Sequence, residues 1–388
     1  MVNKKICIIS PLGYTGIAYY DHSLSEKLSA IGFTIVLITS KFRIINPEVT
    51  SYEIKRMFSG TYGESNKIKK GLSYIWCMVK IYCYILKHKF RIVHCQILEL
   101  PIIDVIFFAM LRICGVSIVF TPHDVRSFKN SNLNLFSNLM FKLSNFIIVH
   151  NKSNVAELVN EYHIRREKVK IIPHGNYSIF LNTELGKKEA REKIGICLDK
   201  KIILFFGNIR PGKGLETAIS AFKMLKDCTD SMFLIVGKVS KNYDIGWLRK
   251  ELENEFLKSR IVFRNNFISD EFIESYYKAS DIILVPYENA FESGVLRYAF
   301  SCGVPVIASD IDIFKEFAVD MENCLIFKRG DARDLSEKIR VLLTDRLLAE
   351  KISMNARELS NQKWDWMESA YKTKEVYELL RVEKYEDR

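Results

Sequence analysis

The sequence has 388 residues, 48% of them hydrophobic, with 18 glycines and 8 prolines. A chain of this length exceeds one ordinary core, so we expect two globular domains, and the composition excludes collagen-like and disordered proteins. The net charge is +11, and residues 1–190, with 25 Lys and Arg against 13 Asp and Glu, carry +12 while the remainder carries −1. This half is expected to meet an anionic partner, unless its lysines only form a solvated surface.

Cysteine usage and apolar runs indicate a cytoplasmic protein. The nine cysteines form no C-x-x-C pair and several lie in apolar runs, which favours free thiols over disulfides or a zinc site. Residues 1–10 lead directly into a strand and show no signal peptide. The most apolar run, residues 100–120, contains Asp104, Arg112 and Gly115, so it predicts a buried helix and strand rather than a membrane span.

The first half alternates short apolar runs with helical patterns. Strands are predicted at 4–10, 33–39, 51–58, 90–96, 116–121, 145–150 and 168–173, and helices at 19–32, 65–88, 99–114, 133–143 and 153–162. Such alternation is typical of a parallel sheet covered on both faces.

The pattern restarts after a polar stretch, residues 182–201, which we interpret as a linker. Six further strands are predicted at 202–208, 231–237, 260–265, 281–287, 304–310 and 324–327, and a last helix runs from Trp364 to about residue 385. The fold class is therefore α/β, with two doubly wound Rossmann-like domains facing a cleft. The predicted domains are residues 1–185 and 186–363, followed by a C-terminal helix, 364–388. Ligands of such sheets collect at the carboxyl ends of the strands.

The helix that begins near Ser293 is a candidate anion site. Ser293 is placed to cap the helix, and the amides of Gly294, Val295 and Leu296 have no acceptor within it. Such a terminus attracts anions through its donors and its dipole, and the diphosphate of a sugar nucleotide would suit it. The alternative is an ordinary serine N-cap.

A glycine-rich turn follows the strand at 202–208. Arg210 and Lys213 project from this turn, where two cations would hold a pyrophosphate and stabilise its charge as it leaves. The stretch from Gly207 to Lys213 also matches a P-loop except that Gly214 replaces the Ser or Thr that binds Mg²⁺. A P-loop-like nucleotide-hydrolysing enzyme is therefore a weaker alternative.

Two further loops follow strands of the first half. His123 and Asp124 come directly after a strand, where a neutral imidazole would hydrogen-bond a substrate hydroxyl. Gly13 and Gly16 flank the loop after the first strand, but G-x-G-x-x-G is absent, which disfavours a nicotinamide or flavin cofactor. The acidic run 310–312 lacks supporting ligands, so we expect a turn and no metal.

Residues 67–91 interleave lysines with tyrosines and a tryptophan. Lysines beside amphipathic aromatic side chains suit a helix that lies on an anionic membrane surface. Nucleic acid is a competing partner, since aromatic side chains among lysines also stack bases. A half-buried helix with hydrated lysines is the remaining alternative.

In this order, the motifs resemble the GT-B glycosyltransferases of the retaining family 4 type. The resembling stretches cover nearly the whole chain: residues 16–39, "FTPHD" at 120–124, "KVKIIPHGNY" at 168–177, "FFGNIRPGKGLETAISAF" at 205–222, residues 267–287, "SGVLRYAFSCGVPVIAS" at 293–309 and "KWDWMESAYKTKEVY" at 363–377. The resemblance implies that the C-terminal helix crosses back onto the first domain.

The resemblance also implies an activity and assigns roles. It implies transfer of a sugar from a UDP or GDP type sugar to a glycan or lipid-linked acceptor, with retention and without metal or other cofactor. Peripheral attachment to the inner face of the cytoplasmic membrane is expected, and no nucleic acid partner. The implied catalytic residues are His123, Arg210, Lys213 and Glu292, the donor-binding residues are Gly207, Asn208, Phe267, Ile268, Ser293, Gly294 and Val295, and the acceptor-binding residues are Gly13, Tyr14 and Gly16.

The chain departs from the family pattern at two glutamates. Ala290 and Tyr298 stand in their places, so Glu288 or Glu292 is expected to supply a carboxylate, with Glu292 preferred. Asn208 stands where a phosphate-binding arginine is common, and Arg210 is expected to substitute. The missing glutamates leave a second hypothesis open, a non-catalytic sugar-nucleotide-binding subunit of a glycosyltransferase complex.

Overall fold

The computed structural model describes residues 4–13, 15–41, 50–59, 66–96, 99–123, 125, 131–241, 243–290 and 293–386. The chain forms two compact units, Met1–Gly175 with Trp364–Arg388, and Asn176–Lys363. The boundary between the two units, after Gly175, thus lies earlier than the predicted end of the first domain at residue 185. In the ranges given, every helix is too short or too polar to span a bilayer.

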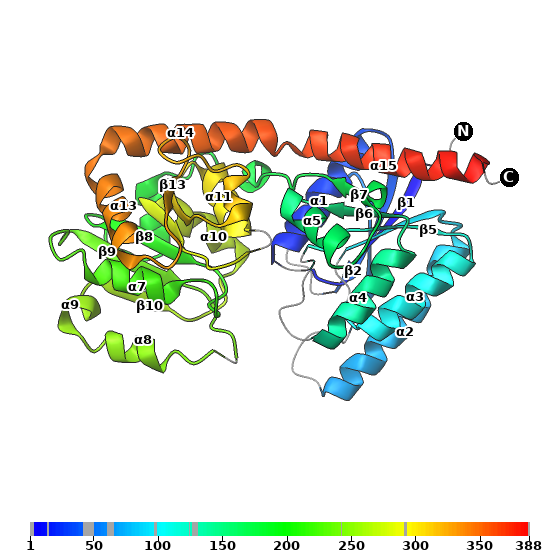
Figure 1. The fold of residues 1–388 in the computed structure, drawn as a ribbon, viewed down its shortest axis with the longest axis horizontal. Helices are drawn as coiled ribbons and strands as arrows, with labels where there is room; N and C mark the ends of the chain where they lie inside the picture. The colour runs from blue at the N-terminus through cyan, green and yellow to red at the C-terminus, as the bar shows by residue number, and fades with distance from the viewer. Residues whose placement is uncertain are drawn as a thin grey trace. The chain divides into compact units, whose positions relative to one another are not determined.

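The first unit is a parallel sheet between helices (Figure 1). Its strand order is β3-β2-β1-β4-β5-β6-β7, and every pairing is parallel. The strands are β1 (Lys5–Ser10), β2 (Thr34–Ser40), β3 (Glu53–Phe58), β4 (Ile92–Cys95), β5 (Ser117–Phe120), β6 (Phe146–Val149) and β7 (Val169–Ile171). The helices are α1 (Thr15–Ala30), α2 (Lys67–Lys87), α3 (Pro101–Ile113), α4 (Ser131–Leu143), α5 (Lys152–Asn160) and α15 (Trp366–Glu386).

The second unit repeats this plan with the strand order β10-β9-β8-β11-β12-β13, again parallel throughout. Its strands are β8 (Lys201–Phe206), β9 (Ser231–Val236), β10 (Ile261–Arg264), β11 (Ile282–Val285), β12 (Val306–Ser309) and β13 (Leu325–Phe327). Its helices are α6 (Lys187–Lys193), α7 (Leu215–Lys223), α8 (Gly246–Glu251), α9 (Glu255–Lys258), α10 (Asp270–Ala279), α11 (Gly294–Cys302), α12 (Asp312–Lys315), α13 (Ala332–Thr344) and α14 (Arg346–Lys363). The predicted class of two doubly wound α/β domains is confirmed.

Apolar side chains cover both faces of the first sheet. One cluster joins the strands to α2, α3 and α4 through Tyr74, Phe108 and Phe141. The other joins them to α1 and α15, and it includes Trp366 and Tyr377. Burial on both faces explains why the central strands are continuous apolar runs rather than alternating ones. It also confirms that the C-terminal helix returns to the first domain.

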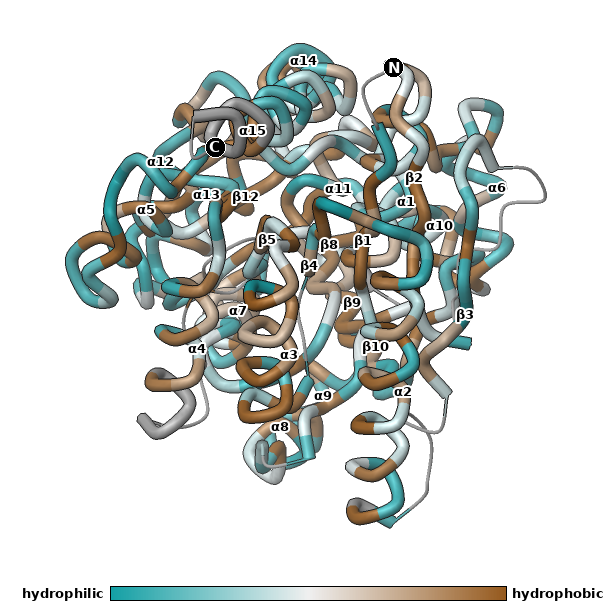
Figure 2. Tube along the Cα trace, turned by 90° about the vertical axis from the view of Figure 1, so that its right-hand side faces the viewer, coloured by the Kyte–Doolittle hydropathy of each residue, from teal (hydrophilic) through white to brown (hydrophobic). Residues whose placement is uncertain are grey.

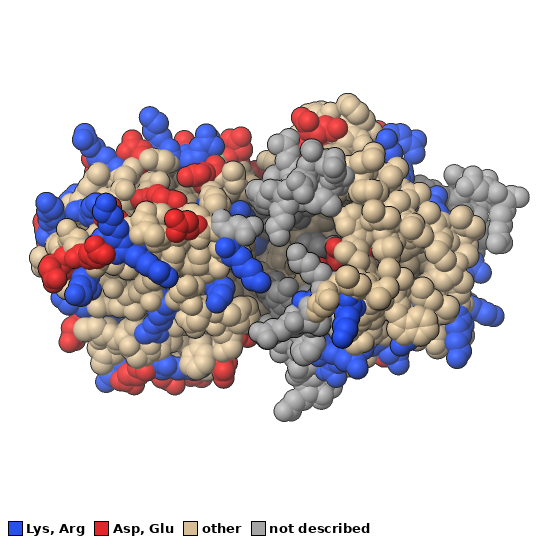
Figure 3. Space-filling model, turned by 90° about the horizontal axis from the view of Figure 1, so that it is seen from below, with Lys and Arg blue, Asp and Glu red and all other residues tan. Residues whose placement is uncertain are grey.

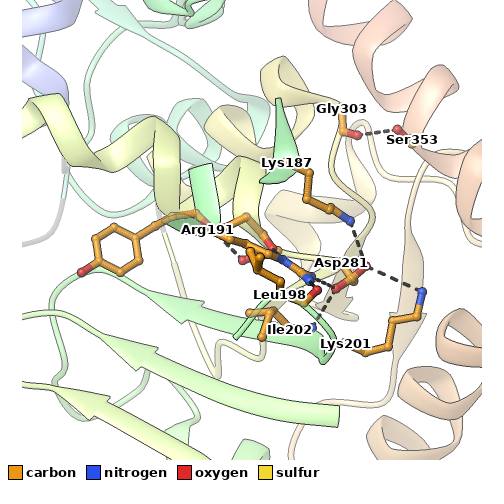
Figure 4. A network of polar contacts seen from close by, with 11 residues as sticks. Lys187, Arg191, Leu198, Lys201, Ile202, Asp281, Gly303 and Ser353 are labelled. Carbon is orange, nitrogen blue, oxygen red and sulfur yellow. Dashed lines mark hydrogen bonds and ion pairs between the residues drawn. The ribbon is translucent and has the colours of Figure 1, made fainter. Parts of the chain in front are cut away.

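The stretch predicted as a linker belongs instead to the second unit. It contains α6, which packs on α10 and buries Ala190 and Arg191. The Arg191 guanidinium donates to Asp281 at 2.8 Å, and Lys187 and Lys201 also face this carboxylate (Figure 4). Asp281 further accepts from the Ile202 amide at 2.7 Å, which fixes the start of β8. The polar composition of residues 182–201 suggested a linker. Composition cannot show that Arg191 is buried, or that its partner is Asp281, 90 residues further along the chain.

A carboxyl group is buried between α2 and α3. Asp104 is 1% exposed and accepts a hydrogen bond of 2.7 Å from the Tyr74 hydroxyl. Burial penalises the charged form and raises the pKa of Asp104 from 3.8 to about 7. The folded protein therefore binds this proton more tightly than the unfolded chain does.

We predict that Asp104 makes the protein less stable as pH rises. The protonated Asp104 contributes its full stabilisation below pH 3.8. Between pH 3.8 and about pH 7 the free energy of unfolding falls by about 1.4 kcal/mol per pH unit because of this group. Asp104→Asn cannot ionise, so it should raise the melting temperature at pH 8 and flatten this slope. The measurement is thermal unfolding from pH 4 to 8. Asp312→Asn, whose side chain is 93% exposed, is the control, and an unchanged slope in Asp104→Asn would contradict the prediction.

Candidate functional site

Two loops meet at the carboxyl edge of the second sheet. Residues 207–214 follow β8 and residues 286–293 follow β11, and these two strands are hydrogen-bonded neighbours. The strand order changes direction at this pair, because β9 lies on the other side of β8. Ligands of doubly wound sheets bind at such switch points.

The two loops touch at Gly212. The Glu288 amide donates to the Gly212 carbonyl at 3.0 Å, and a Cβ added to Gly212 would lie 3.2 Å from Asn289 Oδ1. A Cβ added to Gly207 would lie 3.3 Å from Val295 Cγ2 on α11. The glycine-rich turn therefore lies against the segment that leads into α11.

The cations of the turn are held near this segment. Lys213 Nζ lies 3.5 Å from the centroid of the Tyr287 ring, a cation–π contact. The Lys213 amide donates to the Arg210 carbonyl at 3.2 Å, so the two residues close one turn. Both side chains are half-buried and Tyr287 is buried. The turn thus presents positive charge beside the loop that precedes α11.

Ser293 caps α11. Its hydroxyl oxygen accepts a hydrogen bond of 3.2 Å from the Leu296 amide, and the residue is buried. The first intrahelical bond is Arg297 to the Ser293 carbonyl, so the amides of Gly294 and Val295 open the helix without an acceptor inside it. Helix geometry and dipole therefore favour an anion at this end.

Polar contacts fix the second loop from behind. Arg329 donates through Nη1 to the Glu288 carbonyl at 3.1 Å, and its amide donates to Asp310 Oδ1 at 2.8 Å. The Ser309 hydroxyl donates to the Tyr287 carbonyl at 2.5 Å. Arg329 and Tyr287 were missed as site residues because no motif links them to the turn. The preferred carboxylate, Glu292, lies outside the described residues.

The turn excludes the side chain that a P-loop requires. Gly214 has φ +70° at the start of α7, and a Cβ added there would lie 1.8 Å from the Pro286 carbonyl oxygen. A serine or threonine cannot occupy this position without moving backbone. The structure therefore gives no support to the P-loop alternative.

Of the other predicted donor residues, Asn208 belongs to the glycine-rich turn, and Phe267 and Ile268 follow β10. Asn208 is exposed and accepts from the Ser240 hydroxyl at 3.2 Å. Phe267 and Ile268 line a pocket of about 290 Å³ after β10, the edge strand. Tyr276 of α10 also lines this pocket, and its ring centroid lies 5.9 Å from that of Phe206, the last residue of β8. The predicted base-binding pair therefore shares a pocket with a residue that contacts the strand before the glycine-rich turn.

Tyr298, which replaces a family glutamate, is a packing residue. It is buried on α11, and its ring centroid lies 4.6 Å from that of Tyr277 and 5.1 Å from that of Tyr177. An aromatic ring in this cluster cannot supply the carboxylate that the family pattern places there. Ala290 is half-buried and also carries none.

The carboxyl edge of the first sheet gathers histidines. His123 follows β5, is 8% exposed, and shares a hydrogen bond of 3.0 Å with Gln96, which follows β4. Its ring centroid lies 5.2 Å from that of His150 and 4.8 Å from that of Tyr20. Gln96 was missed, although its place after a buried strand was a usable signal. Asp124 lies outside the described residues.

Neighbouring imidazoles are held by hydrogen bonds. His150 Nδ1 bonds the Ile172 carbonyl at 2.8 Å, and His174 Nδ1 bonds the Gly175 carbonyl at 2.7 Å. His94 bonds Tyr377 and Thr121, and burial followed by the charge of His150 lowers the pKa of His94 to about 3. Among the described residues, no group of three or more His, Cys, Asp or Glu is arranged to hold a metal ion.

The predicted acceptor loop follows β1. Gly13 is buried and lies in this loop, between β1 and α1. Gly16 lies in the first turn of α1 and not in the loop. The helix begins at Thr15, four residues before the predicted start at residue 19. Tyr14 lies outside the described residues.

Both units match known families. A model described as "Glycosyltransferase Family 4" matches residues 14–175, and one described as "Glycosyl transferases group 1" matches residues 186–359. Paired Rossmann-like units of this kind define the GT-B class. The chain belongs to the GT-B glycosyltransferases of the family 4 type.

Curated relatives agree with this assignment. A Campylobacter jejuni N,N'-diacetylbacillosaminyl-diphospho-undecaprenol alpha-1,3-N-acetylgalactosaminyltransferase is 30% identical over 232 residues, 58% of this chain and 58% of that protein. The Staphylococcus aureus capsular polysaccharide biosynthesis glycosyltransferase CapM is 25% identical over 269 residues, 64% of this chain and 67% of that protein. The match thus spans about three fifths of the length of the Campylobacter relative.

Solved structures share the fold. Sucrose-phosphate synthase from Thermosynechococcus elongatus has a TM-score of 0.77 at 21% identity, over 97% of this chain and 99% of that chain. Anabaena Alr3699/HepE, solved in complex with UDP-glucose, has a TM-score of 0.75 at 16% identity, over 96% and 99%.

We predict that Gly214→Ala disrupts the contact between the two loops. Gly195 is the matched control, since it has φ +61° and a Cβ added there meets nothing within 4 Å. Gly195→Ala should cost about 1–2 kcal/mol of unfolding free energy from the backbone conformation alone. Gly214→Ala should cost about 1–3 kcal/mol in addition, because its Cβ overlaps the Pro286 carbonyl. Denaturant titration measures both, and equal losses would contradict the prediction.

Proposed function

We propose that the chain transfers a sugar from a UDP or GDP type sugar to a glycan or lipid-linked acceptor. The pathway would be the synthesis of a bacterial surface polysaccharide: capsule, exopolysaccharide or lipopolysaccharide. The observation that carries the proposal is the contact of the Lys213 turn with the loop that opens α11. The named activities of the Campylobacter and Staphylococcus relatives support the acceptor class.

The donor diphosphate would lie at the switch point of the second unit. Amides from Ser293 to Val295 would bind its oxygens, and Arg210 and Lys213 would neutralise the charge that develops on the leaving group. Gly207 leaves room for the diphosphate, and Asn208 lies beside it. Phe267 and Ile268 would border the base, and Glu292, or Glu288, would supply the carboxylate.

The first unit would hold the acceptor and orient the transferred sugar. Gly13, Tyr14 and Gly16 form the expected acceptor loop, and His123 would bind a hydroxyl of the sugar. Gln96 fixes the His123 ring through Nε2. This bond constrains the orientation of the imidazole ring.

Transfer would proceed with retention and without metal or other cofactor. The leaving phosphate itself would accept the acceptor proton on the same face of the sugar. No protein nucleophile is needed, and the contribution of the protein is then positioning and charge stabilisation. The protein would act in the cytoplasm, peripherally on the inner face of the membrane, with residues 67–91 on anionic lipid and no nucleic acid partner.

A non-catalytic sugar-nucleotide-binding subunit is the second candidate. The specific observation in its favour is that Tyr298 and Ala290 carry no carboxylate where the family places two. Such a subunit would bind the donor and support an active partner. Hydrolysis of the donor by the isolated protein would exclude it.

We predict that Lys213→Ala lowers turnover at least about 100-fold while the fold survives, because the leaving diphosphate loses a fixed cation. Donor hydrolysis or sugar transfer is the measurement, with circular dichroism as the check on folding. Lys258→Ala, at a 67% exposed side chain on α9, is the control and should leave the rate unchanged. A Lys213→Ala rate equal to that of the wild type would remove this lysine from the site.

We further predict that one nucleotide raises the melting temperature without Mg²⁺. A panel of UDP, GDP, ADP and their common sugars, each with and without Mg²⁺, identifies it. Binding to the folded state alone adds about 2.7 kcal/mol at a ligand concentration of 100 times Kd. Binding that depends on Mg²⁺ would contradict the metal-independent mechanism.

A further inference from the structure

Two helices of the first unit expose apolar stripes. Their exposed members are Ile68, Leu72, Ile75, Trp76, Val79 and Leu86 on α2, and Ile102, Ile106, Met110 and Ile113 on α3. Spacings of three and four place each set along one side of its helix. The most exposed are Ile113 at 85% and Ile68 at 71%. The sequence predicted a buried helix at 99–114, and this was wrong for its outer face.

The stripes belong to one surface. α2 contacts α3, and α3 contacts α4, which adds exposed Leu135 and Leu139. Figure 2 shows these three helices side by side with hydrophobic residues along them. Their opposite faces pack into the core through Tyr74, Phe108 and Phe141. We call the outward side of α2, α3 and α4 the three-helix surface.

Charge on these helices has one sign. Their only acidic residue is Asp104, which is buried against Tyr74. Their basic residues are Lys67, Lys69, Lys70, Lys80 and Lys87 on α2, Arg112 on α3 and Lys142 on α4. In Figure 3, Lys and Arg gather at the edge of a broad uncharged area on this unit.

Trp76 combines both properties. It is 60% exposed, and Lys80 Nζ lies 5.1 Å from its ring centroid. Indole rings with a nearby lysine favour the boundary between headgroups and acyl chains. If this surface binds a bilayer, the Trp76 ring is therefore expected at the boundary between the lipid headgroups and the acyl chains.

Single exposed apolar residues are ordinary on protein surfaces. In the described part of the second unit, such residues are dispersed, for example Met224 after α7, Phe267 after β10, and Leu347 and Met354 on α14. The three-helix surface differs because its apolar residues lie on neighbouring helices whose own exposed charges are all basic. A contiguous apolar patch of this kind marks an interaction site.

We propose that the three-helix surface docks on an anionic phospholipid bilayer, with the α2 and α3 stripes at headgroup depth. This deepens the membrane attachment in the proposed function: it rests on that attachment, extends it from α2 to α3 and α4, and does not depend on the donor site. A second copy of this chain is a poor occupant, since two such surfaces would oppose like charges. An anionic bilayer complements both the lysines and the apolar stripes.

The test uses the full chain with vesicles of phosphatidylcholine alone or with 30% phosphatidylglycerol. We expect pelleting with the anionic vesicles and little without them. Trp76 fluorescence should shift to the blue and be quenched by brominated acyl chains. The other tryptophans, Trp247, Trp364 and Trp366, are half-buried or buried, and Trp76→Phe should abolish the shift.

Glutamate variants distinguish a specific role of the apolar stripes from a general effect of the protein's net charge. Leu72→Glu and Ile113→Glu should each lower the vesicle partition coefficient about tenfold, because each removes apolar contact and adds repulsion. Met354→Glu and Leu347→Glu are the controls, at 66% and 79% exposure on α14, and should have no effect. Circular dichroism verifies that all four variants fold.

The outcomes are distinct. If anionic vesicles fail to bind at low salt, or if binding survives both stripe variants, the proposal is overturned. If the protein self-associates without lipid and the stripe variants abolish this, the surface is a dimer interface and the proposal is again overturned. Donor hydrolysis is measured in parallel, so loss of vesicle binding with intact hydrolysis rejects this surface alone.

Discussion

The candidate site depends on one close approach of backbone to backbone. Gly214 lies so near the Pro286 carbonyl that no side chain fits between them. This approach lets the loop after β8 lie along the loop after β11, and it brings Lys213 onto the Tyr287 ring. The cap at Ser293 is then in the same loop as Tyr287. Under the proposed function, the positive side chains and the helix amides would act on one anion only if the two loops keep this contact.

The sequence predicts much of this framework because the signals are local. Parallel strands buried on both faces appear as short apolar runs, and both sheets have the predicted strands. The Ser293 cap is predicted correctly because capping depends on residues within one helical turn. The turn at 207–214 is recognisable for the same reason, since glycines at Gly207, Gly212 and Gly214 all have positive φ.

The remaining features depend on contacts between distant residues. Arg329 reaches the Glu288 carbonyl across the sheet edge, and composition gives no sign of it. The gathering of His123, His150 and His174 around Tyr20 follows from strand order, which local patterns do not fix. The exposed face of α3 escaped prediction because its helix is apolar on both sides, so hydrophobicity alone cannot distinguish core from surface. Roles for Tyr14 and Glu292 rest on resemblance only, as these residues lie outside the described ranges.

The discontinuous first unit has a consequence for biosynthesis. Trp366 and Tyr377 complete the core on one face of the first sheet, yet they are translated after the whole second unit. During translation α1 is the helix of this cluster that covers that face until α15 leaves the ribosome, whereas the second unit is already complete in sequence. Premature termination before Trp364 would therefore expose apolar residues of the first sheet to solvent and favour aggregation, although the second unit would be complete.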